Sequence, residues 1–238
     1  MERDRPLDPT GLPSVAAVLF DLDGTLVDTM QAFADLAAAV MAAHHGADVA
    51  RARARYLETS GVPFAHQLEI LFPGHPANRS ASDEFERRKL AVCDATPMDA
   101  RTLGGLAALR GLGLRLAVSS NTPQPVVDDF ARREAFRFDL ALGFDPARGL
   151  RKGRPHVDHV LAIFGLERDQ LVLVGDSLKD GDLADESGVA FIGRLGTFTD
   201  ADFRRRDPGA ITVAAIDELP ALLGGRMATE PGIARRPV

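Results

Sequence analysis

Short apolar segments alternate with longer stretches of mixed polarity along most of the chain. Six segments have the length and the aliphatic composition of buried strands: residues 15–20, 114–119, 138–142, 171–175, 189–193 and 211–215. Amphipathic stretches with helical spacing separate the later segments, at residues 100–112, 123–134 and 155–164. Repeated strand–helix–strand units predict an α/β fold, a doubly wound parallel sheet with helices on both faces and a Rossmann-like core.

One interval of the chain contains no strand segment. The pattern there is helical only, with candidate helices at residues 30–46, 47–60, 64–72 and 82–94. An all-helical insert after the first strand is typical of a second, smaller domain. We therefore predict an inserted helical domain at residues 29–98. The α/β core would comprise residues 1–28 and 99–238, of which 224–238 form a loosely attached tail.

Composition and charge narrow the class of protein. With 238 residues, 45% of them hydrophobic and 26% charged, the chain has the composition of a globular protein with a sizeable core. The net charge of −6 argues against general nucleic-acid binding. No apolar run approaches the roughly 20 residues that span a bilayer, so we expect no membrane contact. The single cysteine, Cys93, and the absence of a secretory apolar centre in residues 1–14 favour the cytoplasm.

Carboxylates follow two of the predicted strands, at the point where each strand ends. Asp21 and Asp23 come directly after the first strand, and Asp176 and Asp180 follow the strand at residues 171–175. Parallel strands bring their carboxyl ends, where ligands bind, to one edge of the sheet. Because clustered carboxylates repel one another and desolvate poorly, they need a cation, and all-oxygen ligation suits magnesium.

Phosphate-binding groups follow other predicted strands. Ser119, Ser120 and Asn121 end one strand, and Lys152 precedes a helix that can begin at Pro155. Magnesium held by few carboxylates usually also binds a phosphate oxygen, so Lys152 and the Ser120 hydroxyl would hold the remaining ones. One carboxylate can then attack phosphorus while another moves a proton. The alternatives are that Ser119 and Ser120 are turn residues and that Lys152 is a solvated surface lysine.

Taken in order, these segments resemble the four motifs of the haloacid dehalogenase-like hydrolases. Within that family they are similar to the phosphoglycolate phosphatase and β-phosphoglucomutase-like group. The matching segments are DLDGT at residues 21–25, Ser120-Asn121, Lys152 with Pro155, and residues 175–177 with Asp180. The resemblance spans about residues 15–223, and it identifies the helical insert with the mobile cap of the group.

The resemblance implies catalytic roles for four residues. Asp21 would be the nucleophile that forms an aspartyl-phosphate. Asp23 would be the general acid to the leaving group and then the general base to the attacking water. Ser120 and Lys152 would bind the phosphate, and Lys152 would also offset the charge on Asp21.

The resemblance also implies the metal ligands. Mg²⁺ would be the cofactor, bound by the carboxylates of Asp21 and Asp176 and by the backbone carbonyl of Asp23. Asp180 would bind the metal directly or hold its waters.

Further substrate contacts are expected from both domains. Thr25 and Asn121 would contact the substrate from the core motifs. Phe64 lies near a helix start in the segment at residues 59–67, which in the family faces the pocket when the cap closes. The alternative for Phe64 is a place in the small hydrophobic core of the cap itself.

The predicted function is that of a magnesium-dependent phosphatase acting on a small phosphorylated metabolite. Two alternatives stay open at this point: a phosphosugar mutase of the β-phosphoglucomutase type, and a non-enzymatic phospho-acceptor domain. Chain length, the large insert and the acid at Asp23 disfavour the phospho-acceptor, because that acid would promote hydrolysis of a phosphoryl-aspartate. The sequence does not identify the metabolite, and it allows either a monomer or a homodimer.

Overall fold

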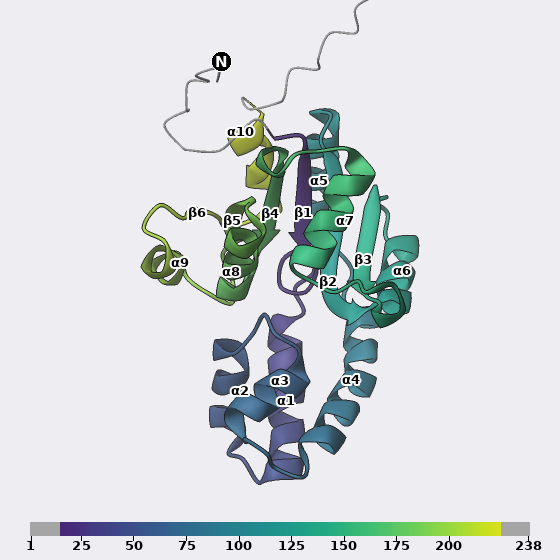
Figure 1. The fold of residues 1–238 in the computed structure, drawn as a ribbon. Coiled ribbons are helices and arrows are strands. Elements are labelled where there is room, and N and C mark those ends of the chain that lie inside the picture. The colour runs from purple at the N-terminus through teal and green to yellow at the C-terminus, as the bar shows by residue number, and fades with distance from the viewer. Residues whose placement is uncertain (1–14, 225–238) are drawn as a thin grey trace, which may run out of the picture.

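A computed structural model describes residues 15–224 and confirms the predicted α/β fold. Six strands form one parallel sheet in the order β3-β2-β1-β4-β5-β6 (Figure 1). The strands are β1 (Ala17–Asp21), β2 (Arg115–Pro123), β3 (Leu140–Phe144), β4 (Leu171–Gly175), β5 (Ala190–Arg194) and β6 (Ile211–Val213). Each strand overlaps one of the six apolar segments, because strands buried on both faces read as continuous hydrophobic runs.

Helices cover both faces of the sheet. Those of the core are α5 (Ala100–Gly111), α6 (Gln124–Arg133), α7 (Arg154–Phe164), α8 (Leu178–Ser187), α9 (Asp200–Arg206) and α10 (Leu219–Leu223). On one face Val18 and Phe20 of β1 pack in a hydrophobic cluster with side chains of α5, α6 and α10. On the other face Ala17 and Leu19 pack in a cluster with side chains of α7 and α8. Alternate residues of one strand thus anchor the two layers of helices.

Four helices between β1 and α5 form a separate unit. They are α1 (Met30–His45), α2 (Val49–Glu58), α3 (Phe64–Leu71) and α4 (Asn78–Ala95). Their apolar side chains, among them Phe33, Met41 and Phe85, make a hydrophobic cluster of their own. The unit lies beyond the carboxyl ends of the strands (Figure 1). This is the predicted all-helical cap, although the exact division of the chain at residues 29 and 98 stays a prediction.

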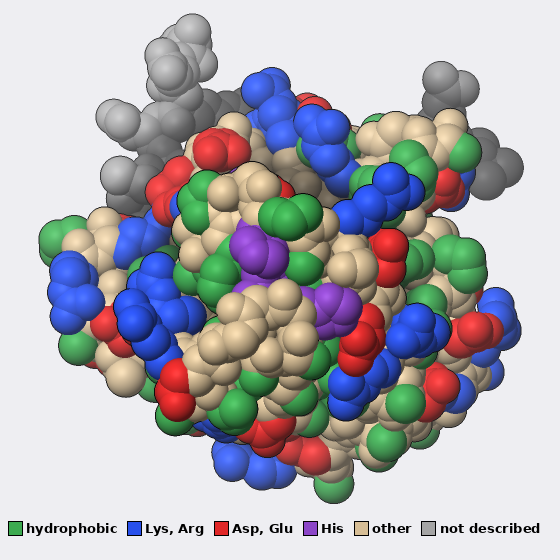
Figure 2. Space-filling model, turned by 90° about the horizontal axis from the view of Figure 1, so that it is seen from below, with side chains coloured by type: hydrophobic (Ala, Val, Ile, Leu, Met, Phe, Trp, Pro, Cys, Tyr) green, Lys and Arg blue, Asp and Glu red, His purple; other side chains and the backbone are tan. Residues whose placement is uncertain are grey.

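The outer face of the cap mixes charged side chains of both signs around a group of histidines (Figure 2). His44 and His45 end α1, and the rings of His45 and His75 lie with their centroids 4.7 Å apart. Within residues 15–224, no helix is long and apolar enough to cross a membrane. The tail predicted at 224–238 lies, after Gly224, outside the described residues.

Candidate active site

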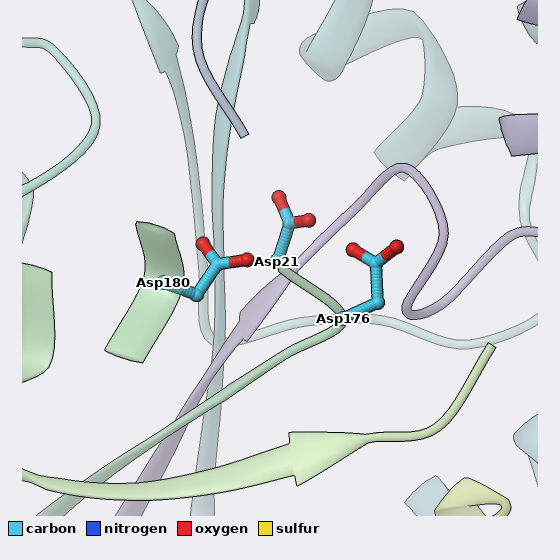
Figure 3. Close-up of side chains that lie close together, drawn as sticks. All are labelled: Asp21, Asp176 and Asp180. Atoms are coloured by element: carbon cyan, nitrogen blue, oxygen red, sulfur yellow. The ribbon is translucent and has the colours of Figure 1, made fainter. Parts of the chain in front are cut away.

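Three carboxylates meet at the carboxyl ends of β1 and β4. Asp21 is the last residue of β1 and Asp176 follows β4, and the two strands are hydrogen-bonded neighbours. Asp180 lies in the first turn of α8. Asp21, Asp176 and Asp180 are all buried, and each offers a carboxylate oxygen within 4.8 Å of the others (Figure 3).

Local sequence fixes the positions of two of these acids. Ser177 caps α8: its hydroxyl accepts a hydrogen bond from the Asp180 backbone N–H at 3.1 Å and donates one to the Asp180 carboxylate at 2.6 Å. Gly24 has a φ of +86°, and a Cβ there would overlap the Asp176 carboxylate. Only glycine allows the turn after β1 to pack this closely against that acid.

Lys152 is the cation within this cluster. Its Nζ lies 2.7 Å from Asp21 Oδ1 and 2.7 Å from Asp180 Oδ1, and its side chain is 5% exposed. The bond to Asp21 is well directed, whereas the Asp180 contact is an ion pair outside hydrogen-bond geometry. Burial by itself would lower the pKa of Lys152, but the two carboxylates outweigh it and raise that pKa. The alternative of a solvated surface lysine is therefore wrong.

The cluster carries more negative than positive charge. Burial raises the pKa of Asp21 well above its ordinary value, and the neighbouring carboxylates add to this while Lys152 opposes it. Burial and then Asp180 raise the pKa of Asp176 to about 6. Three buried carboxylates with one lysine fit a divalent cation bound through oxygen, which would favour the charged forms of Asp21 and Asp176.

The Asp23 carboxylate lies apart from this cluster, on the side of the cap. It accepts hydrogen bonds from the Thr29 hydroxyl at 3.0 Å and from the Thr122 hydroxyl at 3.3 Å. Lys89 Nζ, from cap helix α4, lies 3.8 Å from the same carboxylate and donates to the Thr122 hydroxyl at 3.0 Å. The cap and the core thus hold this acid jointly.

Lys89 is a site residue that sequence reasoning missed. Burial alone would lower the pKa of Lys89, but the carboxylates of Asp23 and Glu86 raise it above its ordinary value. In the sequence it ends the run at residues 87–89, Arg-Arg-Lys, which reads as a solvated helix face. No local signal distinguishes it from its neighbours, because only the approach of α4 to the end of β2 gives it partners.

A small cavity of about 80 Å³ lies between the sheet edge and the cap, lined by residues of both. Ser120 and Asn121 line it from the core, beside Asp21 and Asp23, and Phe64 lines it from the cap. The cap also touches the core directly. A Cβ on Gly61, whose φ is +92°, would come within 2.5 Å of the Ser177 hydroxyl oxygen.

The two serines at the end of β2 have different partners. His156 is fully buried, and burial lowers its pKa to about 4, so its ring is neutral at pH 7. Its Nε2 is 3.0 Å from the Gly143 carbonyl, which fixes that nitrogen as the donor. Nδ1 therefore accepts from the Ser119 hydroxyl at 2.8 Å. The Ser119 hydroxyl is thus bound to His156, whereas Ser120 lines the cavity.

Two predicted substrate contacts have mixed surroundings. The Thr25 hydroxyl makes a long contact of 3.5 Å with Asp176 Oδ1, and Thr25 is not among the residues that line the cavity. Phe64 lines the cavity but also packs in the cap cluster, with its ring centroid 4.1 Å from that of Phe85. Phe64 thus lies both at the cavity and in the hydrophobic core of the cap. The substrate contacts expected of Thr25 and Phe64 stay predictions.

Comparison with known proteins agrees with this geometry. The haloacid dehalogenase-like hydrolase family profile matches residues 18–194. A phosphoglycolate phosphatase of Chromobacterium violaceum is 28% identical over an alignment of 219 positions, which covers 87% of this chain and 96% of that protein. A haloacid dehalogenase-like hydrolase domain-containing protein of Arabidopsis thaliana is 26% identical over an alignment of 186 positions, which covers 76% of this chain and 68% of that protein.

Solved structures share the fold. A haloacid dehalogenase-like family hydrolase from Streptococcus pneumoniae superposes with a TM-score of 0.72 at 19% identity, covering 88% of this chain and 98% of that one. CbbY from Rhodobacter sphaeroides, solved in complex with phosphate, gives 0.63 at 21% identity, covering 86% and 96%. The profile match over most of the chain shows that the protein belongs to the haloacid dehalogenase-like hydrolase family and that it is an enzyme, similar along most of its length to a phosphoglycolate phosphatase.

Proposed function

We propose that this phosphatase of the haloacid dehalogenase-like family hydrolyses a small phosphorylated metabolite, with Mg²⁺ as cofactor and Asp21 as nucleophile. The observation that carries the proposal is the buried cluster of Asp21, Asp176 and Asp180, only partly neutralised by one lysine, with Asp21 and Asp176 lining the cavity. In this proposal residues 29–98 act as a cap that closes over a core made of residues 1–28 and 99–238.

Asp21, Asp176 and Asp180 would hold the metal, with the backbone carbonyl of Asp23 as a further oxygen ligand. When bound, Mg²⁺ supplies positive charge that keeps the carboxylates ionised and offsets the charge of the phosphate oxygens. Burial and the raised pKa of Asp176 support this, because the cluster is electrostatically incomplete on its own.

In the first step a carboxylate oxygen of Asp21 attacks phosphorus, and the bond from phosphorus to the ester oxygen breaks. Asp23 gives its proton to the departing oxygen, and the phosphoryl group stays on Asp21 as an acyl phosphate. Lys152, Ser120 and Asn121 donate hydrogen bonds to the phosphoryl oxygens and so orient the group for in-line attack.

In the second step water attacks the phosphorus of the aspartyl-phosphate. Asp23, now a carboxylate, takes the proton of that water, and inorganic phosphate and the free Asp21 carboxylate are released. The threonine hydroxyls that bind Asp23 orient its carboxylate in both protonation states, since a hydroxyl can donate or accept. Closure of the cap keeps other water away from the first step.

A panel of small phosphate monoesters tests the proposal, assayed for released phosphate with MgCl₂ and again with a chelator. We expect magnesium-dependent turnover of at least one metabolite and of p-nitrophenyl phosphate. Glucose 1-phosphate with its bisphosphate activator is included to detect mutase activity. Turnover that is unaffected by the chelator, or retained in the Asp21→Asn variant, would refute the mechanism. The cytoplasmic location and the state as monomer or homodimer stay predictions from the sequence.

A further inference from the structure

Helix α4 delivers a second charged side chain to the cavity, Glu86, one turn before Lys89. Glu86 is half-buried and lines the cavity. Among residues 15–224, no hydrogen bond or ion pair within 4.0 Å engages its carboxylate. Lys89 could neutralise it but is directed to Asp23 and Thr122 instead. An acid that faces the substrate site and has no partner in the protein is available to a group of the substrate.

The charges around the cavity leave no cation for a second anionic group of the substrate. Lys152 is committed to Asp21 and Asp180 in the floor, and Lys89 is the remaining lining cation in the described chain. Lys89 lies between two acids, because Asp23 is its ion-pair partner and Glu86 is one turn earlier on the same helix. Lys89 therefore leaves no positive charge in surplus on the cap side.

Aromatic rings form the rest of this wall. Phe33, Tyr56, Phe64 and Phe85 all line the cavity, and they pack on one another with centroid separations of 4.1 to 6.2 Å. In the described chain no hydrogen bond to the Tyr56 hydroxyl is present, although Tyr56 is 5% exposed. A leaving group here meets ring faces, one hydroxyl and one carboxylate, which suit a hydrogen-bond donor on a short carbon chain.

We infer that Glu86 sets the substrate class. It selects a phosphate monoester whose leaving group carries a hydroxyl or an ammonium group, and it discriminates against one that carries a carboxylate. The inference rests on the proposed function, since it concerns the leaving group of the same reaction. A substrate carboxylate about 6 Å from the Glu86 carboxylate, at an effective dielectric of about 40, would bind on the order of ten-fold more weakly than a neutral group.

Four esters with the same two-carbon skeleton test this inference: 2-hydroxyethyl phosphate, O-phosphoethanolamine, ethyl phosphate and 2-phosphoglycolate. We expect the magnesium-loaded enzyme to have a kcat/KM about ten-fold or more lower for 2-phosphoglycolate than for the better of the hydroxyl and ammonium esters. Comparison of 2-hydroxyethyl phosphate with O-phosphoethanolamine shows whether Glu86 accepts a hydrogen bond from a hydroxyl or from an ammonium group. Ethyl phosphate should lie between the donor-bearing esters and the carboxylate.

The Glu86→Gln variant should lower the ratio of kcat/KM between the better donor-bearing ester and 2-phosphoglycolate about ten-fold. The change should lie mainly in KM, since the amide keeps the shape of the side chain and loses its charge. Asp83→Asn is the matched control: it removes an exposed acid on the same helix and should leave the ratio unchanged. A wild-type preference for 2-phosphoglycolate, or a ratio that Glu86→Gln leaves unchanged, would overturn the inference while the phosphatase function stands. No hydrolysis of these esters or of p-nitrophenyl phosphate with Mg²⁺ would overturn both.

Discussion

Replacing Lys152 by methionine should destabilise the fold strongly. The substitution keeps most of the length of the side chain and removes the one positive charge that, among residues 15–224, is in direct contact with Asp21 and Asp180. Removing one partner of a buried ion pair costs about 3–5 kcal/mol, because the other charge stays buried without compensation. For a chain of this size, that loss corresponds to a Tm lower by roughly 6–20 °C.

The loss should depend on pH in a defined direction. Without Lys152, which opposes the rise in their pKa values, Asp21 and Asp176 bind protons more tightly in the folded state than in the unfolded chain. A raised folded-state pKa of an acid gives stability at low pH that is lost as pH rises through that pKa, and for Asp176 this is already about 6. The deficit of Lys152→Met relative to the wild type should therefore shrink between pH 7.5 and pH 5.5.

Thermal unfolding at both pH values, with and without MgCl₂, measures these effects. We expect MgCl₂ to raise the Tm of Lys152→Met more than that of the wild type, because the uncompensated cluster binds the cation more tightly. Lys179→Met is the control, since Lys179 is 56% exposed and its pair with Asp182 is a surface pair. If Lys152→Met lost no more stability than this control at pH 7.5, the charge balance assigned to the cluster would be incorrect.

Four further predictions concern single residues. Asp21→Asn should abolish turnover with the far-UV circular dichroism unchanged; residual activity above a small fraction would exclude Asp21 as nucleophile. Asp23→Ala should lower kcat by about 10²–10⁴ for alkyl phosphates and less for p-nitrophenyl phosphate; equal losses would argue against an acid role. Phe64→Ala should cost about 3–5 kcal/mol in urea unfolding, as for other buried phenylalanines, and a loss below about 1 kcal/mol would contradict its place in the cap cluster. His156→Gln should flatten the fall in stability between pH 6.5 and pH 4, because burial lowers the pKa of His156 to about 4 and the unfolded chain binds the proton first; an unchanged slope would mean that His156 is charged in the fold.

The sheet and its carboxylate edge could be predicted from the sequence because both depend on local patterns. An apolar run such as residues 171–175 is long enough for one strand and too short for a helix of average length. An acid directly after such a run must lie at a strand end. Since all the strands are parallel, Asp21 and Asp176 lie at the same edge of the sheet, and no knowledge of the side-chain packing is needed to infer this.

The cap side of the site could not be predicted in this way. Lys89 and Glu86 sit in a helix whose charged residues look alike in sequence, and which of them faces the cavity depends on how α4 packs against β2 and α6. His156 follows the Lys152 motif, but its partner Ser119 is 37 residues earlier in the chain. Such pairs become visible only when the tertiary contacts are known.

The way the cap is connected to the core has a consequence for how this enzyme can diversify. The chain leaves the core after β1 and returns to it at the start of α5, and both points lie at the carboxyl edge of the sheet, since α5 runs back to the start of β2. The insert contributes no strand to the sheet, and β1 pairs directly with β2 and β4 on its far side. Most cap residues can therefore vary without moving Asp21, Asp176 or Lys152, whereas Lys89 of α4 is tied to the core through Asp23 and Thr122. Sequence change in the cap is thus constrained at this one contact with the catalytic acid more than in the rest of its surface.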